Sequence, residues 1–203
     1  MGFRPDLADS HLQVEGEIAS GASLGRLDAA SLEIRIAGPD DASQLAATTR
    51  LGFESYLSWA PEGWRPPPRS LEIRAIRERL RQASTWCAMA LEPDGEPAGH
   101  VGITHASERE RSHVRIPGRA HLWMLFVRPA WWGTGLATRL HRLGLEAALR
   151  QGYETIRLYT PAGQSRARAF YVREGWVLTG RPFEEPLLGL QLVEYRRELC
   201  SSR

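Results

Sequence analysis

The sequence predicts an α/β (α+β) fold in one domain, and three observations lead to that prediction. The chain has 203 residues, of which 42% are hydrophobic and 25% charged, as in a single domain with a sizeable core. Short runs with the alternation or apolar density of strands recur along it. Segments with helical periodicity lie between those runs, so helices are expected to cover a sheet.

The N-terminal part differs from the rest in composition. Residues 1–31 are rich in Gly, Ser, Ala and Asp and have no sustained period. Such a segment cannot bury much apolar surface. We therefore expect a flexible extension at 1–31 and the folded domain at 32–203.

Before residue 107 the patterns predict a strand, two helices and a hairpin. Apolar and charged residues alternate in the first strand. Three prolines at 66–68 separate the helices, because proline cannot continue a helix. Asp94-Gly95 is a strong hairpin signal. The expected elements are a strand at 32–37, helices at 41–58 and 70–82, and strands at 85–91 and 98–104.

A polar segment at 107–118 has no apolar period, which predicts an exposed loop. The loop is either a solvated connection or a lid on the substrate side. The sequence alone leaves both readings open.

Charge and cysteine content exclude several classes. The 26 basic and 24 acidic residues are mixed along the chain, which argues against a nucleic-acid partner. Cys87 and Cys200 are too far apart in sequence for a CxxC metal or redox motif, so we expect no metal. No apolar run approaches the roughly 18 residues of a membrane span, and no signal peptide is recognisable. We expect no membrane association and a cytoplasmic location.

The chemistry is expected to lie after residue 120. An apolar run at 121–127 predicts a central strand, and apolar residues at helical spacing up to Gly152 predict a helix. A glycine-containing turn joins them, Trp131-Trp132-Gly133-Thr134-Gly135-Leu136-Ala137-Thr138.

A turn of this kind can bind an anion, because backbone N–H groups converge at a helix start and glycines let a phosphate approach. Gly133 and Gly135 alone are also compatible with a tight turn that needs glycine only for steric reasons. A dinucleotide-binding turn is a poor fit, because its third glycine would fall at Thr138.

The downstream sequence is more specific. A strand is predicted at 154–160 and a short helix at 164–174, which carries Ala167, Phe170 and Tyr171 before Gly175-Trp176. Together with Val127-Arg128-Pro129 and the glycine turn, these residues resemble the GCN5-related N-acetyltransferase (GNAT) family in order and spacing. The close resemblance covers 120–176. Trp132 departs from it, where Arg or Gln is usual, and so does Gln164, where Asn is common.

The resemblance implies a GNAT fold, with a mixed, mostly antiparallel sheet of about six or seven strands and about four helices. It also implies acetyl-CoA as co-substrate. The residues it assigns to the cofactor are Phe126, Val127, Trp132, Gly133, Thr134, Gly135, Leu136, Ala137, Thr138, Gln164 and Tyr171.

The resemblance also suggests catalytic roles. Tyr171 would protonate the leaving thiolate, because a phenol can donate a proton at neutral pH. A backbone N–H of Phe126 or Val127 would stabilise the oxyanion. His121 is the candidate base and is expected to share a strand face with Trp123 and Leu125. The alternatives are His100, His105, Glu54 or a water chain without a single base.

Aromatic residues in the region of the first two predicted helices, Tyr56, Trp59 and Trp64, are candidates for substrate binding. The two tryptophans could equally belong to the core or to a dimer surface. The expected activity is acetylation of a small-molecule amine. A protein N-terminus or lysine, and a catalytically silent acyl-CoA-binding module, remain alternatives, and a homodimer stays open.

Overall fold

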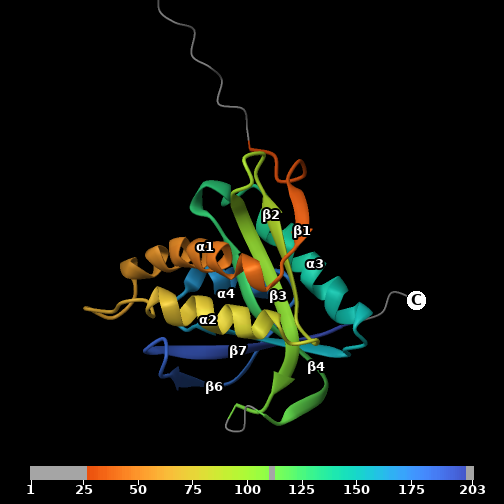
Figure 1. The fold of residues 1–203 in the computed structure, drawn as a ribbon. Coiled ribbons are helices and arrows are strands. Elements are labelled where there is room, and N and C mark those ends of the chain that lie inside the picture. The colour runs from red at the N-terminus through yellow and green to blue at the C-terminus, as the bar shows by residue number, and fades with distance from the viewer. Residues whose placement is uncertain (1–26, 110–112, 200–203) are drawn as a thin grey trace, which may run out of the picture.

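The computed structural model describes residues 27–109 and 113–199, and these form one sheet with helices on both faces (Figure 1). In this part of the chain seven strands lie in the order β1-β2-β3-β4-β5-β7-β6. The pair β4–β5 is parallel and the other neighbours are antiparallel. The strands are β1 (Glu33–Ile36), β2 (Trp86–Leu91), β3 (Pro97–Ser107), β4 (Arg115–Val127), β5 (Thr155–Pro161), β6 (Val177–Glu185) and β7 (Leu190–Glu198). The helices are α1 (Ala42–Glu54), α2 (Arg69–Leu80), α3 (Leu136–Arg150) and α4 (Ser165–Arg173).

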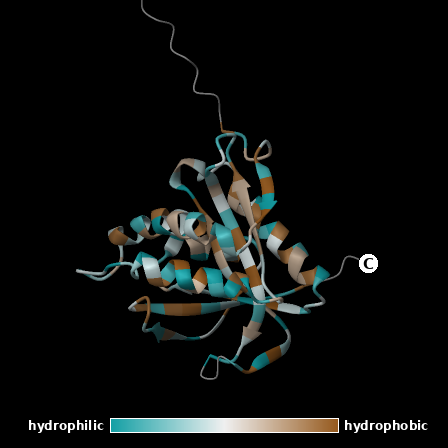
Figure 2. Ribbon diagram, in the orientation of Figure 1, coloured by the Kyte–Doolittle hydropathy of each residue, from teal (hydrophilic) through white to brown (hydrophobic). Residues whose placement is uncertain are grey.

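Each face of the sheet has its own apolar layer. One cluster joins the sheet to α3 and α4 and contains Leu140 and Tyr171. A second lies under α1 and α2 and contains Leu45 and Ile76. Helix α2 carries mostly hydrophilic residues (Figure 2), and Ile76 is its one buried residue. Helix α2 is thus held by a narrow apolar contact, with its polar side chains left outside the core.

The prediction of a mixed, mostly antiparallel sheet of about six or seven strands with about four helices is confirmed. The prediction of a loop at 107–118 is wrong at both of its bounds. Strand β3 continues to Ser107, and β4 begins at Arg115, its partner in the ladder. Backbone hydrogen bonds hold this hairpin whatever the polarity of its side chains, so a polar sequence concealed the strand ends.

Residues 1–26 of the predicted extension lie outside the described residues. The next few residues contact the domain, because Ala29 is buried in the cluster on the α3–α4 face. Arg139 of α3 donates hydrogen bonds to the carbonyls of Ala29 and Leu32, the second at 3.1 Å. The described end of this segment is therefore anchored on α3.

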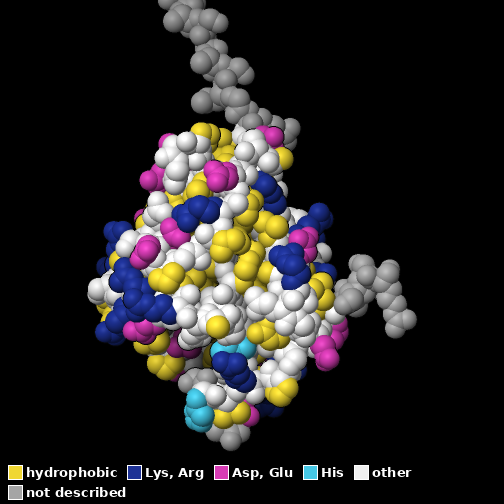
Figure 3. All heavy atoms as spheres, turned by 45° about the vertical axis from the view of Figure 1, so that its right-hand side comes forward, with side chains coloured by type: hydrophobic (Ala, Val, Ile, Leu, Met, Phe, Trp, Pro, Cys, Tyr) yellow, Lys and Arg dark blue, Asp and Glu magenta, His cyan; other side chains and the backbone are white. Residues whose placement is uncertain are grey.

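Charged side chains of both signs are interspersed on the face shown in Figure 3. Within residues 27–109 and 113–199, no helix is long and apolar enough to cross a membrane. No group of three or more potential metal ligands occurs within those same ranges.

Candidate functional site

The site is centred on a divergence of two strands. Parallel pairing between β4 and β5 ends at Leu122 and Leu158. Beyond that point β4 runs on to Val127 and β5 to Pro161 without pairing to each other. The interstrand opening therefore leaves backbone groups of β4 available to a ligand.

A β-bulge lies where the divergence begins. The register between β3 and β4 shifts between Gly102 and Ile103, so Trp123 of β4 has no partner. Trp123 and the next residue both pack in the α1–α2 cluster, whereas Leu125 packs against the opposite one. The expectation that Leu125 shares a face with His121 is therefore wrong, because a bulge reverses the alternation.

The turn before α3 presents free donors. Gly133 and Gly135 have φ values of 81° and 89°, a region that glycine enters without strain. Among the described residues, the N–H groups of Gly133, Gly135, Ala137 and Thr138 donate no hydrogen bond. Four unpaired donors at the start of a 15-residue helix form a ready site for an anion.

Other members of the predicted cofactor set have different environments. The side chain of Leu136 is in the core, and its N–H donates to Oγ1 of Thr134 at 3.4 Å. The hydroxyl of Thr138 donates to Glu174 at 3.1 Å. Gln164 precedes α4 as its N-cap and makes no capping bond with its side chain. These residues shape the turn and its neighbour α4, while the backbone supplies the free donors.

The ring of Trp132 holds the guanidinium of Arg166 beside this turn. Its Nε1 donates to the carbonyl of Val127 at 2.8 Å, and the guanidinium of Arg166 stacks 4.1 Å from its ring. Sequence reasoning did not select Arg166, because α4 and the turn meet only in the folded chain. The structure thus places a guanidinium beside the position where this sequence lacks the usual Arg or Gln.

Tyr171 of α4 lies near enough to Tyr56 for one hydroxyl to affect the pKa of the other. Tyr171 is buried, and its ring packs against those of Trp176 and Tyr195 at 5.9 and 6.0 Å. Burial, and then the neighbouring Tyr56, raise the pKa of Tyr171, while burial raises the pKa of Tyr56 to about 12. Both hydroxyls therefore keep their protons at neutral pH.

His121 lies beside the opening on the α1–α2 face. Its ring centroid is 5.1 Å from that of Tyr159, the β5 residue just past the divergence. Its Nδ1 is buried without a partner in the described residues. Burial lowers the pKa of His121 to about 3, with further lowering by Arg157 and Arg79. The imidazole is therefore neutral at pH 7.

The alternative bases lie in other surroundings. His100 is fully buried beneath α1, 3.4 Å from the hydroxyl of Thr49, and burial lowers its pKa to about 3. The Nδ1 of His105 is 2.8 Å from the hydroxyl of Ser84. Glu54 is exposed at the end of α1.

The three aromatic substrate candidates form one cluster with Phe53 of α1. Tyr56 lies 4.7 Å from Trp59 and 5.8 Å from Trp64, measured between ring centroids. Trp64 is buried and donates from Nε1 to the carbonyl of Leu188 at 2.7 Å. Trp59 is only half-buried, and its Nε1 has no partner among the described residues. Trp59 is thus the least buried of the three, and no described residue accepts a hydrogen bond from its indole N–H.

Comparison with solved structures defines the class of protein. The GNAT acetyltransferase of Staphylococcus aureus Mu50 superposes with a TM-score of 0.63 at 14% identity, covering 84% of this chain and all of that one. The PaiA N-acetyltransferase of Thermoplasma acidophilum, solved with coenzyme A, gives a TM-score of 0.56 at 17% identity, covering 81% of this chain and 98% of that one. The fold is therefore an acetyltransferase fold.

The family follows from the sequence match. The model of the Acetyltransferase (GNAT) family matches residues 51–176, more than half of the chain. The chain therefore belongs to the GNAT family of acyltransferases. It is 30% identical over 148 residues to the mycothiol acetyltransferase of Streptomyces coelicolor, a stretch that is 72% of this chain and 42% of that relative. The chain spans less than half of the relative's length.

Proposed function

We propose that the chain transfers the acetyl group of acetyl-CoA to a primary amine of a small molecule. The observation that carries the proposal is the set of four unpaired N–H groups in the turn before α3 and in the first turn of α3, close to the opening between β4 and β5. A pyrophosphate at these donors would direct the remainder of the cofactor toward the opening. The likeness to a GNAT structure solved with coenzyme A supports this reading.

The residues of the turn fit such a group. A Cβ added to Gly133 or Gly135 would meet no heavy atom within 4 Å, so the space beside both glycines is open to a ligand. Arg166, stacked on Trp132, would add a positive charge beside the phosphates. When bound, acetyl-CoA supplies the thioester carbonyl that an amine can attack.

The backbone of β4 would stabilise the oxyanion. Arg128 donates its N–H to the carbonyl of Ala98 on β3 at 2.9 Å. Because backbone groups point alternately to either side of a strand, the N–H of Val127 points away from β3 and toward the opening. This geometry favours Val127 over Phe126 for the role.

Tyr171 would donate a proton to the leaving thiolate. No hydrogen bond to its hydroxyl occurs within the described part of the chain, and its raised pKa keeps the proton in place. As the C–N bond forms and the C–S bond breaks, the leaving thiolate would take the Tyr171 proton. The amine proton would pass to His121 or a water and then to solvent, from which the phenolate is reprotonated.

His121 would accept the amine proton, directly or through one water. Its neutral ring and unpaired Nδ1 suit an acceptor. A water chain without a single base is the alternative, because burial and two guanidiniums oppose a charged imidazole.

The acceptor would enter on the α1–α2 face. Trp59 is proposed to contact it, whereas buried Tyr56 and Trp64 would mainly shape the wall. A protein N-terminus or lysine is the second acceptor class. A silent acyl-CoA-binding module is less favoured because Tyr171 is retained. A cytoplasmic location and a homodimer remain proposals.

The test is calorimetry with CoA on wild type and Gly135→Glu, followed by thiol release from acetyl-CoA with a panel of amines. Gly152→Glu is the matched control, since Gly152 has a similar φ of 79° and lies at the far end of α3. We expect Gly135→Glu to lose CoA affinity and Gly152→Glu to keep it. Unchanged affinity in a folded Gly135→Glu protein would refute the phosphate site.

A further inference from the structure

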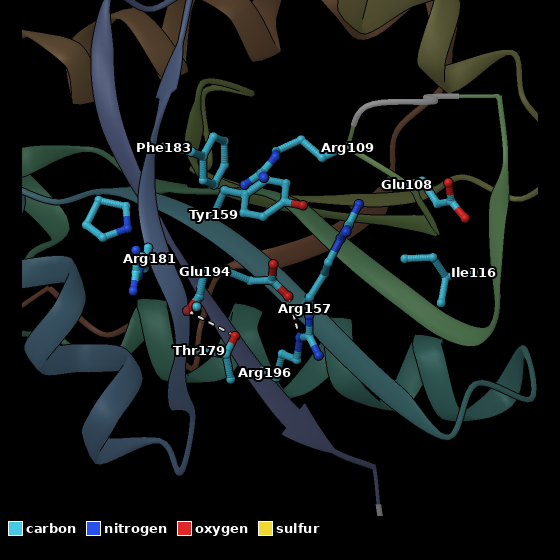
Figure 4. Close-up of a pocket in the computed structure, with 12 residues that line it drawn as sticks. Glu108, Arg109, Ile116, Arg157, Tyr159, Thr179, Arg181, Phe183, Glu194 and Arg196 are labelled. Atoms are coloured by element: carbon cyan, nitrogen blue, oxygen red, sulfur yellow. Dashed lines mark hydrogen bonds and ion pairs between the residues drawn. The ribbon is translucent and has the colours of Figure 1, made fainter.

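A cavity of about 410 Å³ lies on the α1–α2 face of the C-terminal strands (Figure 4). Residues from β5, β6 and β7 form its floor, and the end of the β3–β4 hairpin lines one side. Among the described residues, none that lines the cavity belongs to a helix. The charged residues that line it are Glu108, Arg109, Arg157, Arg181, Glu194 and Arg196.

Arg157 of β5 is the most unusual of these residues. It is 6% exposed and donates from one terminal nitrogen to the carbonyl of Ser107. Its Nε is buried without a partner, and no carboxylate within residues 27–109 or 113–199 forms an ion pair with it. Burial lowers the pKa of Arg157. Buried arginines are rarely left without a counter-charge.

None of the other described lining residues forms an ion pair with Arg157, and only the nearby Glu194 carboxylate and Tyr159 partly oppose the lowering of its pKa. Glu194 forms its ion pair with Arg196, so these two charges offset each other. Arg109 stacks over Phe183 at 4.3 Å, and Arg181 is exposed at the rim. Among the described lining residues, four guanidiniums stand against two carboxylates.

The cavity adjoins the opening where acetyl transfer is proposed. Tyr159 lines it and is the residue that follows the last β4–β5 pair at Leu158. The Tyr159 ring also lies beside that of His121, with 5.1 Å between the centroids. A ligand in the cavity could therefore present an amine at the opening while another part of it stays near Arg157 (Figure 4).

We propose that the acceptor amine carries an anionic group, a carboxylate or a phosphate, and that the guanidinium of Arg157 binds it. The inference rests on the proposed function. Guanidinium is the side chain best suited to both groups, because its planar fork matches their oxygens. Neutral analogues would leave Arg157 buried without a counter-charge, so the enzyme would discriminate against them.

The first test uses wild type and pairs of amines that share a carbon skeleton and differ in the anion. Because a neighbouring anion also raises the pKa of the amine, kcat/KM is calculated for the neutral form of each amine. Phenylalanine is compared with phenylalanine amide for the carboxylate, and phosphoethanolamine with ethanolamine for the phosphate, by thiol release from acetyl-CoA. We expect kcat/KM to be at least about tenfold higher for the anionic member of one pair. Equal rates within both pairs would refute the anion site while leaving acetyl transfer intact. Absence of acetylation of any amine would instead count against the proposed function.

The second test assigns the preference to a residue. Arg157→Gln should reduce the ratio of anionic to neutral kcat/KM toward one. Arg150→Gln, at the exposed end of α3, should keep the wild-type ratio. Circular dichroism and CoA calorimetry confirm that each variant is folded. A wild-type ratio in folded Arg157→Gln would overturn the assignment, and if that variant does not fold, the wild-type comparison still decides on the anion.

Discussion

Replacing His100 by glutamine should make the protein less sensitive to acid. The His100 side chain is fully buried between β3 and α1, where its Nε2 lies 3.4 Å from the hydroxyl of Thr49. Thr49 already donates to the carbonyl of Leu45, so Nε2 carries the proton in this contact. The Nδ1 has no partner among the described residues. A second proton on the ring would therefore be buried without compensation.

The magnitude follows from the two protonation equilibria. Burial lowers the pKa of His100 to about 3, whereas an unfolded histidine titrates near 6.5. Below pH 6.5 the unfolded chain therefore binds more protons than the native one, and the free energy of unfolding falls as pH falls. Each pH unit in this window is worth about 1.4 kcal/mol, so His100 accounts for a loss of about 2 to 3 kcal/mol at pH 4.5.

The assay is urea denaturation of wild type and His100→Gln at pH 7.5 and pH 4.5. The drop in unfolding free energy between these two pH values should be smaller in the variant, by about 2 to 3 kcal/mol. Any constant cost of the substitution cancels in this difference. His113→Gln, at an exposed position, should leave the drop unchanged. An equal drop in wild type and His100→Gln would refute the reasoning.

Three further predictions concern catalysis and cofactor binding. Tyr171→Phe should keep CoA affinity in calorimetry and lower turnover by about a hundredfold or more, because it removes one proton donor and leaves the ring packed; equal turnover with chemistry rate-limiting would exclude the role. His121→Ala should lower kcat/KM most at low pH, where few amines are neutral, and superimposable pH profiles would make His121 a bystander. Arg166→Ala should weaken CoA binding about two- to fivefold, as expected for an exposed charge, with less salt dependence than wild type; unchanged affinity would show that the stack on Trp132 is only structural.

The local parts of the site could be predicted from the sequence. The turn around Gly133 and Gly135 joins a dense apolar run to a strongly periodic helix, and neighbouring residues alone determine that geometry. The structure begins α3 at Leu136 and gives both glycines positive φ, as such a turn requires. The helix bearing Tyr171 also appears where predicted, because its apolar residues and Gly175 mark its course and end.

Features that depend on distant pairing could not be predicted. Arg157 lies on a strand whose partner β7 comes from a part of the chain that follows α4, so its burial has no local signal. Arg166 reaches Trp132 only because α4 packs beside the turn. From the sequence alone, either arginine would be predicted to be an ordinary surface residue. Only the fold shows that Arg157 is buried and that Arg166 stacks on Trp132.

The bulge at Trp123 explains why the side chains of β4 do not follow the alternation predicted from the sequence. A regular β4 would have kept its side chains in strict alternation, with His121 and Leu125 on one face. The extra residue changes the face after Trp123, in the same part of β4 where pairing with β5 stops at Leu122. A bulge bends its strand, so the bend and the separation of β4 from β5 have a common local origin. Apolar periodicity cannot reveal it, because the run is apolar on both faces, and the irregular residue is recognised only from its pairing with β3.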